Sequence, residues 1–224
     1  MSLVFKTTTN IEDAAEFVAS SVLNQLKSGK KVLLFLTGGS SVVVGVKIAE
    51  ILREQASENL LKNLVVTLTD ERYGKVNHPD SNWHQLLEKG FNIPDALLLP
   101  ILEGEEKNLT IENFNIKLNE EFTKAEYKIG LFGIGADGHT AGILPESSAV
   151  SAKDLAFGYD TATFSRITIT FKAIEKLDGA VVWAQGKDKW KVLEELQTDI
   201  SLIKQPAQIL KKIPLLTIFS DFNN

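Results

Sequence analysis

The chain has 224 residues, of which 44% are hydrophobic and 24% are charged, and its formal net charge is -5 at pH 7. This composition is ordinary for a globular protein, and the length predicts one domain over residues 1–224 with a sizeable core. The negative charge argues against nucleic acid and anionic membranes as partners, so an anionic ligand needs a local cluster of donors. The absence of cysteine excludes disulfides, thiolate catalysis and Cys-based zinc sites.

We expect a cytoplasmic protein that is a monomer or a weak homo-oligomer. The first residues, MSLVFKTTTN, contain no signal-peptide hydrophobic region, and no apolar run approaches the ~18 residues of a membrane span. We expect no metal, because His78, His84 and His139 show neither H-x-H nor H-x-x-x-H spacing.

Apolar runs alternate with helical spacing along the chain. Strands are predicted over residues 3–6, 31–37, 64–69, 97–99, 127–132, 166–171, 180–184 and 215–220. Helices are predicted over residues 11–26, from the turn at 38–41 to about 55, over 79–89 and 110–122, as a turn at 173–177, and from 187 to about 196. The alternation predicts an α/β fold with a doubly wound, mostly parallel, Rossmann-like sheet and helices on both faces. The longest irregular segment, 142–165, is a candidate active-site loop.

Three polar clusters follow predicted strands: TGGSS (37–41), TDER (69–72) and GIGADGH (133–139). Ligands of doubly wound folds bind at the carboxyl ends of the strands, near a switch in strand order. The coincidence of the three clusters therefore points to a site more strongly than any one of them does.

The TGGSS cluster has the chemistry of a phosphate cradle. Gly38 and Gly39 allow close approach of the backbone, while Ser40, Ser41 and the free N–H groups of the following helix supply donors. No Gly-Lys-Ser/Thr follows, so it is not a Walker A loop, and the spacing does not fit a G-x-S-x-G nucleophile elbow. A plain strand–helix turn with a serine cap is the alternative.

The TDER cluster places acids and a cation just past a predicted strand. Asp70 can accept a proton, and Arg72 can bind a phosphate or stabilise a developing oxyanion. A surface ion-pair cluster is the alternative. The following NHPDSN (77–82) is typical of a turn and a helix start, with Asp80 or Ser81 as the cap.

GIGADGH contains G-x-G-x-x-G after a predicted strand. However, Pro145 leaves room for at most a turn of helix, and no acidic residue ends a strand about 20 positions on, which argues against dinucleotide binding. We favour glycines that clear space for a substrate faced by Asp137 and His139, with His139 as a base near neutral pH. An ordinary hydrogen-bonded histidine is the alternative.

Arg166 opens a predicted strand, and Lys189 lies near the start of a predicted helix. Isolated charges of this kind are usually solvated. Together with TGGSS, the two side chains would complete a phosphate site.

These motifs, with RITIT (166–170) and GKDK (186–189), resemble in content and order those of the 6-phosphogluconolactonases, which are similar in fold to glucosamine-6-phosphate deaminases. The resemblance runs from about Lys31 to Lys189. It implies a cofactor-free lactonase of the oxidative pentose phosphate pathway, acting on a sugar phosphate. It also implies that TGGSS, Arg166 and Lys189 hold the phosphate, that His139 activates water, that Asp137 orients His139, and that Arg72 stabilises negative charge.

The deaminase branch typically shows M-D-E-Y and D-G-H-I-A-F-N-E-P, with a glutamate that completes an Asp–His–Glu set. Arg72 and Thr140 match the lactonase pattern, and Leu144 stands in place of that glutamate. Gly74-Lys75 and the segment 144–148 (LPESS) depart from the usual lactonase pattern. A deaminase or isomerase with Asp70 as base and a non-catalytic sugar-phosphate sensor remain alternatives.

Overall fold

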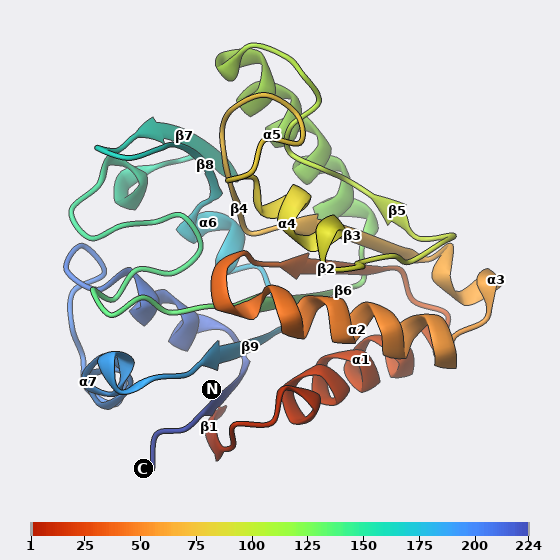
Figure 1. Cartoon of the computed structure of the whole chain (residues 1–224), viewed down its shortest axis with the longest axis horizontal. Helices are drawn as coiled ribbons and strands as arrows, with labels where there is room; N and C mark the ends of the chain where they lie inside the picture. Colours follow the sequence, from red (N-terminus) through yellow and green to blue (C-terminus); the bar gives the residue numbers. More distant parts are fainter. Residues whose placement is uncertain (1, 224) are drawn as a thin grey trace.

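The computed structural model describes residues 2–223 and contains a parallel sheet of seven strands in the order β1-β10-β9-β6-β2-β3-β5 (Figure 1). The strands are β1 (Ser2–Thr7), β2 (Val32–Leu36), β3 (Leu64–Leu68), β5 (Leu97–Leu98), β6 (Tyr127–Phe132), β9 (Gly179–Ala184) and β10 (Leu215–Ser220). Every residue of β2, β3 and β9 is buried, which explains their continuous apolar runs.

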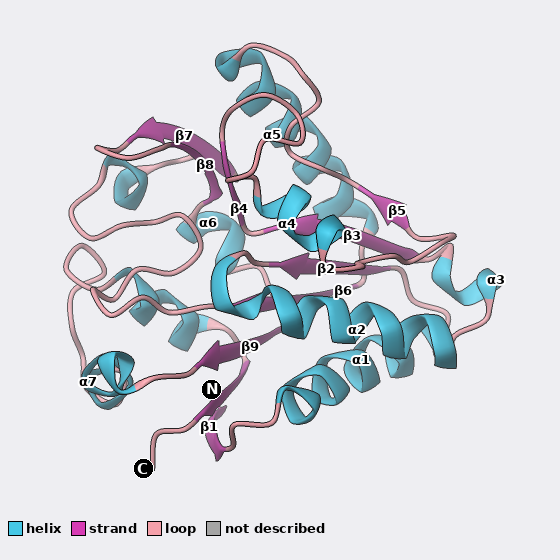
Figure 2. Ribbon diagram, in the orientation of Figure 1, coloured by secondary structure: helices cyan, strands magenta, loops and turns pink. Residues whose placement is uncertain are grey.

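Helices cover both faces of this sheet. They are α1 (Ile11–Lys27), α2 (Val42–Gln55), α3 (Glu58–Leu61), α4 (Asn82–Glu88), α5 (Lys107–Lys124), α6 (Phe171–Ile174) and α7 (Trp190–Glu195). Phe35 and Leu36 of β2 point to opposite faces because side chains alternate along a strand. The Phe35 ring lies 5.8 Å from that of Phe122 in α5, and Leu36 lies against Gly45 in α2. Figure 2 shows α1 and α2 side by side along one face. The predicted doubly wound fold is therefore confirmed.

A second sheet, which the sequence pattern did not predict, is antiparallel and has the order β4-β8-β7. Its strands are β4 (Asp70–Arg72), β7 (Ala156–Asp160) and β8 (Ser165–Ile169). The predicted irregular segment 142–165 is thus wrong over β7, and the strand predicted over 166–171 ends at Ile169 because Phe171 begins α6. Short, half-exposed strands lack the apolar run that marks a buried strand.

The helix predicted over 79–89 begins later, at Asn82. Ser81 is its N-cap, and the Ser81 hydroxyl accepts the backbone N–H of His84 at 3.1 Å. The buried Glu71 carboxylate of β4 accepts the Ser81 hydroxyl and the backbone N–H groups of Asn82 and Trp83. Burial raises the pKa of Glu71, and these hydrogen bonds oppose that rise. The TDER segment is therefore not a surface cluster, because Asp70 and Glu71 are buried.

The strand order reverses at β2, which pairs with β3 on one side and with β6 on the other. The carboxyl ends of β2, β6 and β9 lead into Gly38, Gly133 and Gly186, and β3 leads through Thr69 into β4. The polar clusters of the sequence therefore meet at one edge of the sheet. Within residues 2–223, no helix is both long and apolar enough to cross a membrane.

Candidate active site

A pocket of about 300 Å³ lies at this edge of the sheet. It is lined by all the predicted site residues except Asp137, namely Gly38, Gly39, Ser40, Ser41, Asp70, Arg72, His139, Arg166 and Lys189. Of the other lining residues, Thr37 belongs to TGGSS and Gly133, Ile134 and Gly135 belong to GIGADGH, whereas Asn82 and Ala141 had no predicted site role. The fold thus brings the three polar clusters and both isolated cations to one cavity.

Asp137 lies beside the pocket and contacts His139. The Asp137 Oδ1 and His139 Nδ1 atoms are 2.6 Å apart, and Oδ1 also accepts the backbone N–H of His139 at 3.1 Å. The hydrogen bond with His139 holds the pKa of Asp137 below its usual range. A Cβ atom on Gly135 would lie 2.1 Å from His139 Nδ1, so only glycine leaves room for the imidazole.

The loop that carries His139 is folded on itself. Ile134 and Thr140 form a β-bridge, and Gly135 N–H donates to the His139 carbonyl at 3.0 Å. No helix follows β6 before the 3₁₀ turn at Ser148–Ser151 in the described chain. A dinucleotide-binding turn requires a helix at this point, so the structure agrees with the sequence argument against one.

Arg72 and Arg166 lie directly opposite each other on β4 and β8. Arg166 Nη1 lies 3.7 Å from Asp70 Oδ2, and Arg72 Nη1 donates to the Asp80 carbonyl at 2.8 Å. The Nε atoms of both arginines are buried and have no hydrogen-bond partner in the described structure. Because an unpaired buried donor is costly, the two guanidinium groups are suited to an anionic ligand.

The TGGSS loop forms a 3₁₀ turn, Gly39–Ser41, that leads into α2. The Ser41 Oγ and Asn82 Oδ1 atoms are both buried without a hydrogen-bond partner, and both residues line the pocket. Asn82 Nδ2 donates to the Asp70 carbonyl at 2.9 Å, which fixes the amide orientation. The motif NHPDSN therefore contributes the pocket residue Asn82 as well as the start of α4. Its position shortly after TDER in the sequence is the feature that could have predicted Asn82 as a site residue.

We expect Gly38→Ala to destabilise the protein by about 1–3 kcal/mol, a typical cost of overpacking. The added Cβ would lie 1.9 Å from Asn82 Oδ1 and would push the amide away from the Asp70 carbonyl. Thermal or denaturant unfolding measures the loss. Gly133→Ala is the control, because its Cβ meets only Ser41 Oγ at 3.5 Å. Gly38→Ala/Asn82→Ala should recover part of the loss, and equal stability of Gly38→Ala and wild type would contradict the clash.

Lys189 ends a 3₁₀ turn, Lys187–Lys189, that follows β9. The Asp221 carboxylate holds both sides of this turn, because Oδ1 accepts Gly186 N–H at 3.2 Å and Trp190 Nε1–H at 3.0 Å. The indole hydrogen bond is the main reason that the pKa of Asp221 lies below its usual range. No sequence motif marks Asp221, and its position beside Gly186 follows from the pairing of β10 with β9.

We expect Asp221→Ala to raise KM for a phosphorylated substrate about two- to tenfold, the effect of losing a hydrogen bond of ordinary strength, with kcat unchanged. The loss of both hydrogen bonds would loosen the turn that places Lys189 in the pocket. Asp221→Asn keeps an acceptor oxygen and should lie closer to wild type. Steady-state kinetics of the two variants test this, and an unchanged KM in Asp221→Ala would remove Asp221 from this role.

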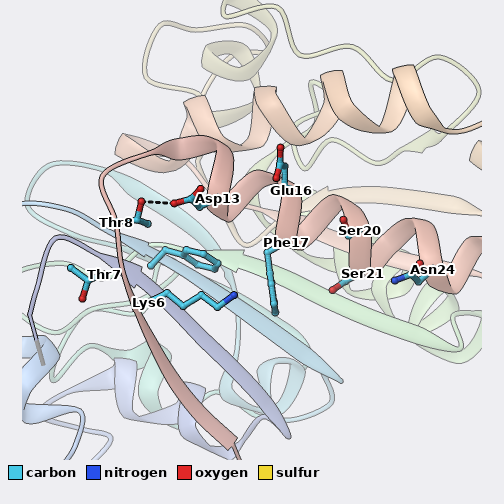
Figure 3. A pocket seen from close by; sticks show the side chains of 10 residues that line it. Lys6, Thr7, Thr8, Asp13, Glu16, Phe17, Ser20, Ser21 and Asn24 are labelled. Carbon is cyan, nitrogen blue, oxygen red and sulfur yellow. Dashed lines mark hydrogen bonds between the residues drawn. The ribbon is translucent and has the colours of Figure 1, made fainter.

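A separate and larger hollow of about 680 Å³ lies between β1 and α1. Figure 3 shows Lys6 extended beside Phe17 and the side chains of Asp13, Glu16 and Ser20 along the helix. The Lys6 Nζ atom lies 4.6 Å from the centroid of the Phe17 ring, so its charge is already stacked on an aromatic face. Of the described residues, none from the three polar clusters lines this hollow.

The fold and the pocket define a doubly wound α/β protein with a cavity at the carboxyl ends of its strands that is lined by Arg72, Arg166 and Lys189. Within residues 2–223, no group of three His, Cys, Asp or Glu side chains is placed to hold a metal ion. Residues 6–216 match the family described as glucosamine-6-phosphate isomerases/6-phosphogluconolactonase. The chain belongs to this family.

The sequence identity to individual members of the family is low. A 6-phosphogluconolactonase of Haemophilus influenzae is 27% identical over 191 residues, which cover 83% of this chain and 79% of the relative. One from Chlamydia trachomatis is 24% identical over 152 residues, 66% of this chain but only 59% of the relative. The crystal structure of 6-phosphogluconolactonase from Thermotoga maritima superimposes with a TM-score of 0.83, over 98% of this chain and 99% of that chain, at 20% identity. At this identity, the superposition shows a common fold.

Proposed function

We propose that the protein hydrolyses 6-phospho-D-glucono-1,5-lactone to 6-phosphogluconate, with His139 as the general base. The observation that carries the proposal is that one pocket contains a carboxylate-paired histidine and two arginines with unpartnered Nε atoms. The histidine is suited to activate water, and the two arginines are suited to hold a phosphate. Family membership and the names of the relatives support the same activity.

The pairing with Asp137 sets the tautomer of His139. A carboxylate accepts hydrogen bonds only, and the pKa of Asp137 is held below its usual range, so the carboxyl is ionised near neutral pH. The proton of neutral His139 therefore lies on Nδ1, which contacts Asp137 at 2.6 Å. Nε2 is left as an acceptor, and it takes a proton from the water that attacks C1 of the lactone.

Attack on the lactone carbonyl produces an oxyanion. Arg72 or the backbone N–H groups of the glycine-rich loops stabilise this charge. The ring oxygen then leaves and takes a proton from the imidazolium of His139. The phosphate, held by TGGSS, Arg166 and Lys189, supplies binding energy that orients the carbonyl.

A coupled assay tests the proposal. Glucose-6-phosphate dehydrogenase generates the lactone in place, and 6-phosphogluconate is detected with its dehydrogenase, against the rate of spontaneous hydrolysis. We expect acceleration by the wild-type protein. A rate equal to the spontaneous background would overturn the proposed activity.

A second candidate is the deamination and isomerisation of glucosamine-6-phosphate. The presence of buried Asp70 in the pocket favours it, since a carboxylate can enolise a sugar. Against it, Asp70 is engaged by Thr69 and Arg166, and Leu144 stands where the deaminases have their glutamate. Ammonia release from glucosamine-6-phosphate distinguishes the two activities.

A further inference from the structure

One aromatic ring lies against both arginines of the pocket. The guanidinium carbon of Arg72 lies 5.4 Å from the centroid of the Phe164 ring, and that of Arg166 lies 5.6 Å from it. Both distances are within the range of cation–π attraction. The two arginines are direct partners on antiparallel strands, where like charges repel. Phe164 therefore adds to the Asp70 carboxylate, 3.7 Å from Arg166, in stabilising two neighbouring positive charges.

The backbone holds Phe164 in place independently of the arginines. Phe164 ends the turn between β7 and β8, and its N–H donates to Thr161 Oγ1 at 3.0 Å. Its carbonyl accepts the Thr161 N–H at 2.8 Å and the Thr161 hydroxyl at 2.9 Å. The backbone of the turn is thus closed on itself, which fixes the point from which the Phe164 side chain extends toward the two arginines.

A guanidinium that lies over an aromatic ring is attracted by its π face, and its N–H groups remain free for hydrogen-bond acceptors elsewhere. The Nε atoms of Arg72 and Arg166 are buried and unpartnered. The guanidinium groups keep their other contacts, to the Asp80 carbonyl and to Asp70. An anion with several oxygens can pair both Nε–H groups and offset the repulsion between the two charges.

We propose that Phe164 is a positioning residue that holds Arg72 and Arg166 as one clamp for a phosphate group. This inference rests on the proposed function for the identity of the substrate, but the clamp itself requires only an anion. It assigns Arg72 to the phosphate together with Arg166, which leaves the oxyanion to the backbone N–H groups of the glycine-rich loops. It also makes the turn at residues 161–164 part of the binding site.

The test compares Phe164→Leu, which has an apolar side chain without a π face, with Phe164→Tyr, which retains the ring. Calorimetric titration with inorganic phosphate measures affinity without turnover, and the ¹⁵N resonances of the arginine Nε–H groups report the contact directly. We expect Phe164→Leu to weaken phosphate binding and to raise KM for the lactone about tenfold, with kcat unchanged, as expected for the loss of two cation–π contacts. Phe164→Tyr should retain wild-type values.

The matched control is Phe157→Leu, on β7 of the same sheet, where the ring stacks on Tyr159 instead. It should leave phosphate affinity unchanged. Wild-type affinity in Phe164→Leu, an equal loss in Phe164→Tyr, or Nε–H resonances that do not respond to phosphate would each overturn the clamp. Retention of this pattern in a protein that does not hydrolyse the lactone would overturn the proposed function alone.

Discussion

His139→Ala is expected to lower kcat for lactone hydrolysis by about 10²-fold or more, because general-base assistance is typically worth that factor. KM should change little, since the residues proposed to hold the phosphate lie on other elements of the pocket. The rate of 6-phosphogluconate formation above the spontaneous background measures the effect. The reason is geometric: the Asp137 carboxylate occupies Nδ1, which leaves Nε2 as the nitrogen of His139 that can accept a proton.

His84→Ala is the matched control for this experiment. His84 is a histidine of α4 whose Nε2 lies 3.3 Å from Glu88 on the surface of the same helix, and it does not line the pocket. Its removal should leave kcat and KM at wild-type values. A preserved kcat in His139→Ala would remove His139 from the role of base, and an equal loss in both variants would indicate a general effect on folding.

The sequence was most informative where burial follows from local pattern. The runs KVLLFLT and LVVTLT could be assigned to central strands because strands covered on both faces are continuously apolar. Polar residues directly after such strands could then be predicted to meet, since parallel strands end at the same edge. The presence of Ser40, after β2, and His139, after β6, in one pocket follows from this rule.

The features that sequence reasoning missed depend on contacts between distant segments. Asn82 enters the pocket because Gly38, on another loop, has no side chain to exclude its amide. Asp221 reaches Gly186 only because β10 lies beside β9. Phe164 contacts both arginines because β4 and β8 pair in one particular register. Local periodicity does not encode such pairings, and short strands such as β4 carry too little of it to be recognised.

Arg166→Ala is expected to raise KM for the lactone about 10- to 100-fold, the range for losing a hydrogen bond to a charged group. It should also destabilise the protein, because the Asp70 carboxylate is buried and would lose the cation that lies 3.7 Å away. Michaelis kinetics and thermal unfolding measure the two effects separately. Arg53→Ala on the exposed side of α2 is the control for removing an arginine and should change neither.

The double variant Arg166→Ala/Asp70→Asn separates binding from stability. Asparagine needs no counter-charge, so the double variant should recover much of the melting temperature lost in Arg166→Ala. The KM should stay high, because the anion would still lack the guanidinium. The KM of Arg166→Lys should lie between those of wild type and Arg166→Ala, since lysine restores the charge but not the planar donor set that includes the buried Nε. A wild-type KM in Arg166→Ala would place the phosphate elsewhere, and recovery of KM in the double variant would mean that Arg166 acts only by neutralising Asp70.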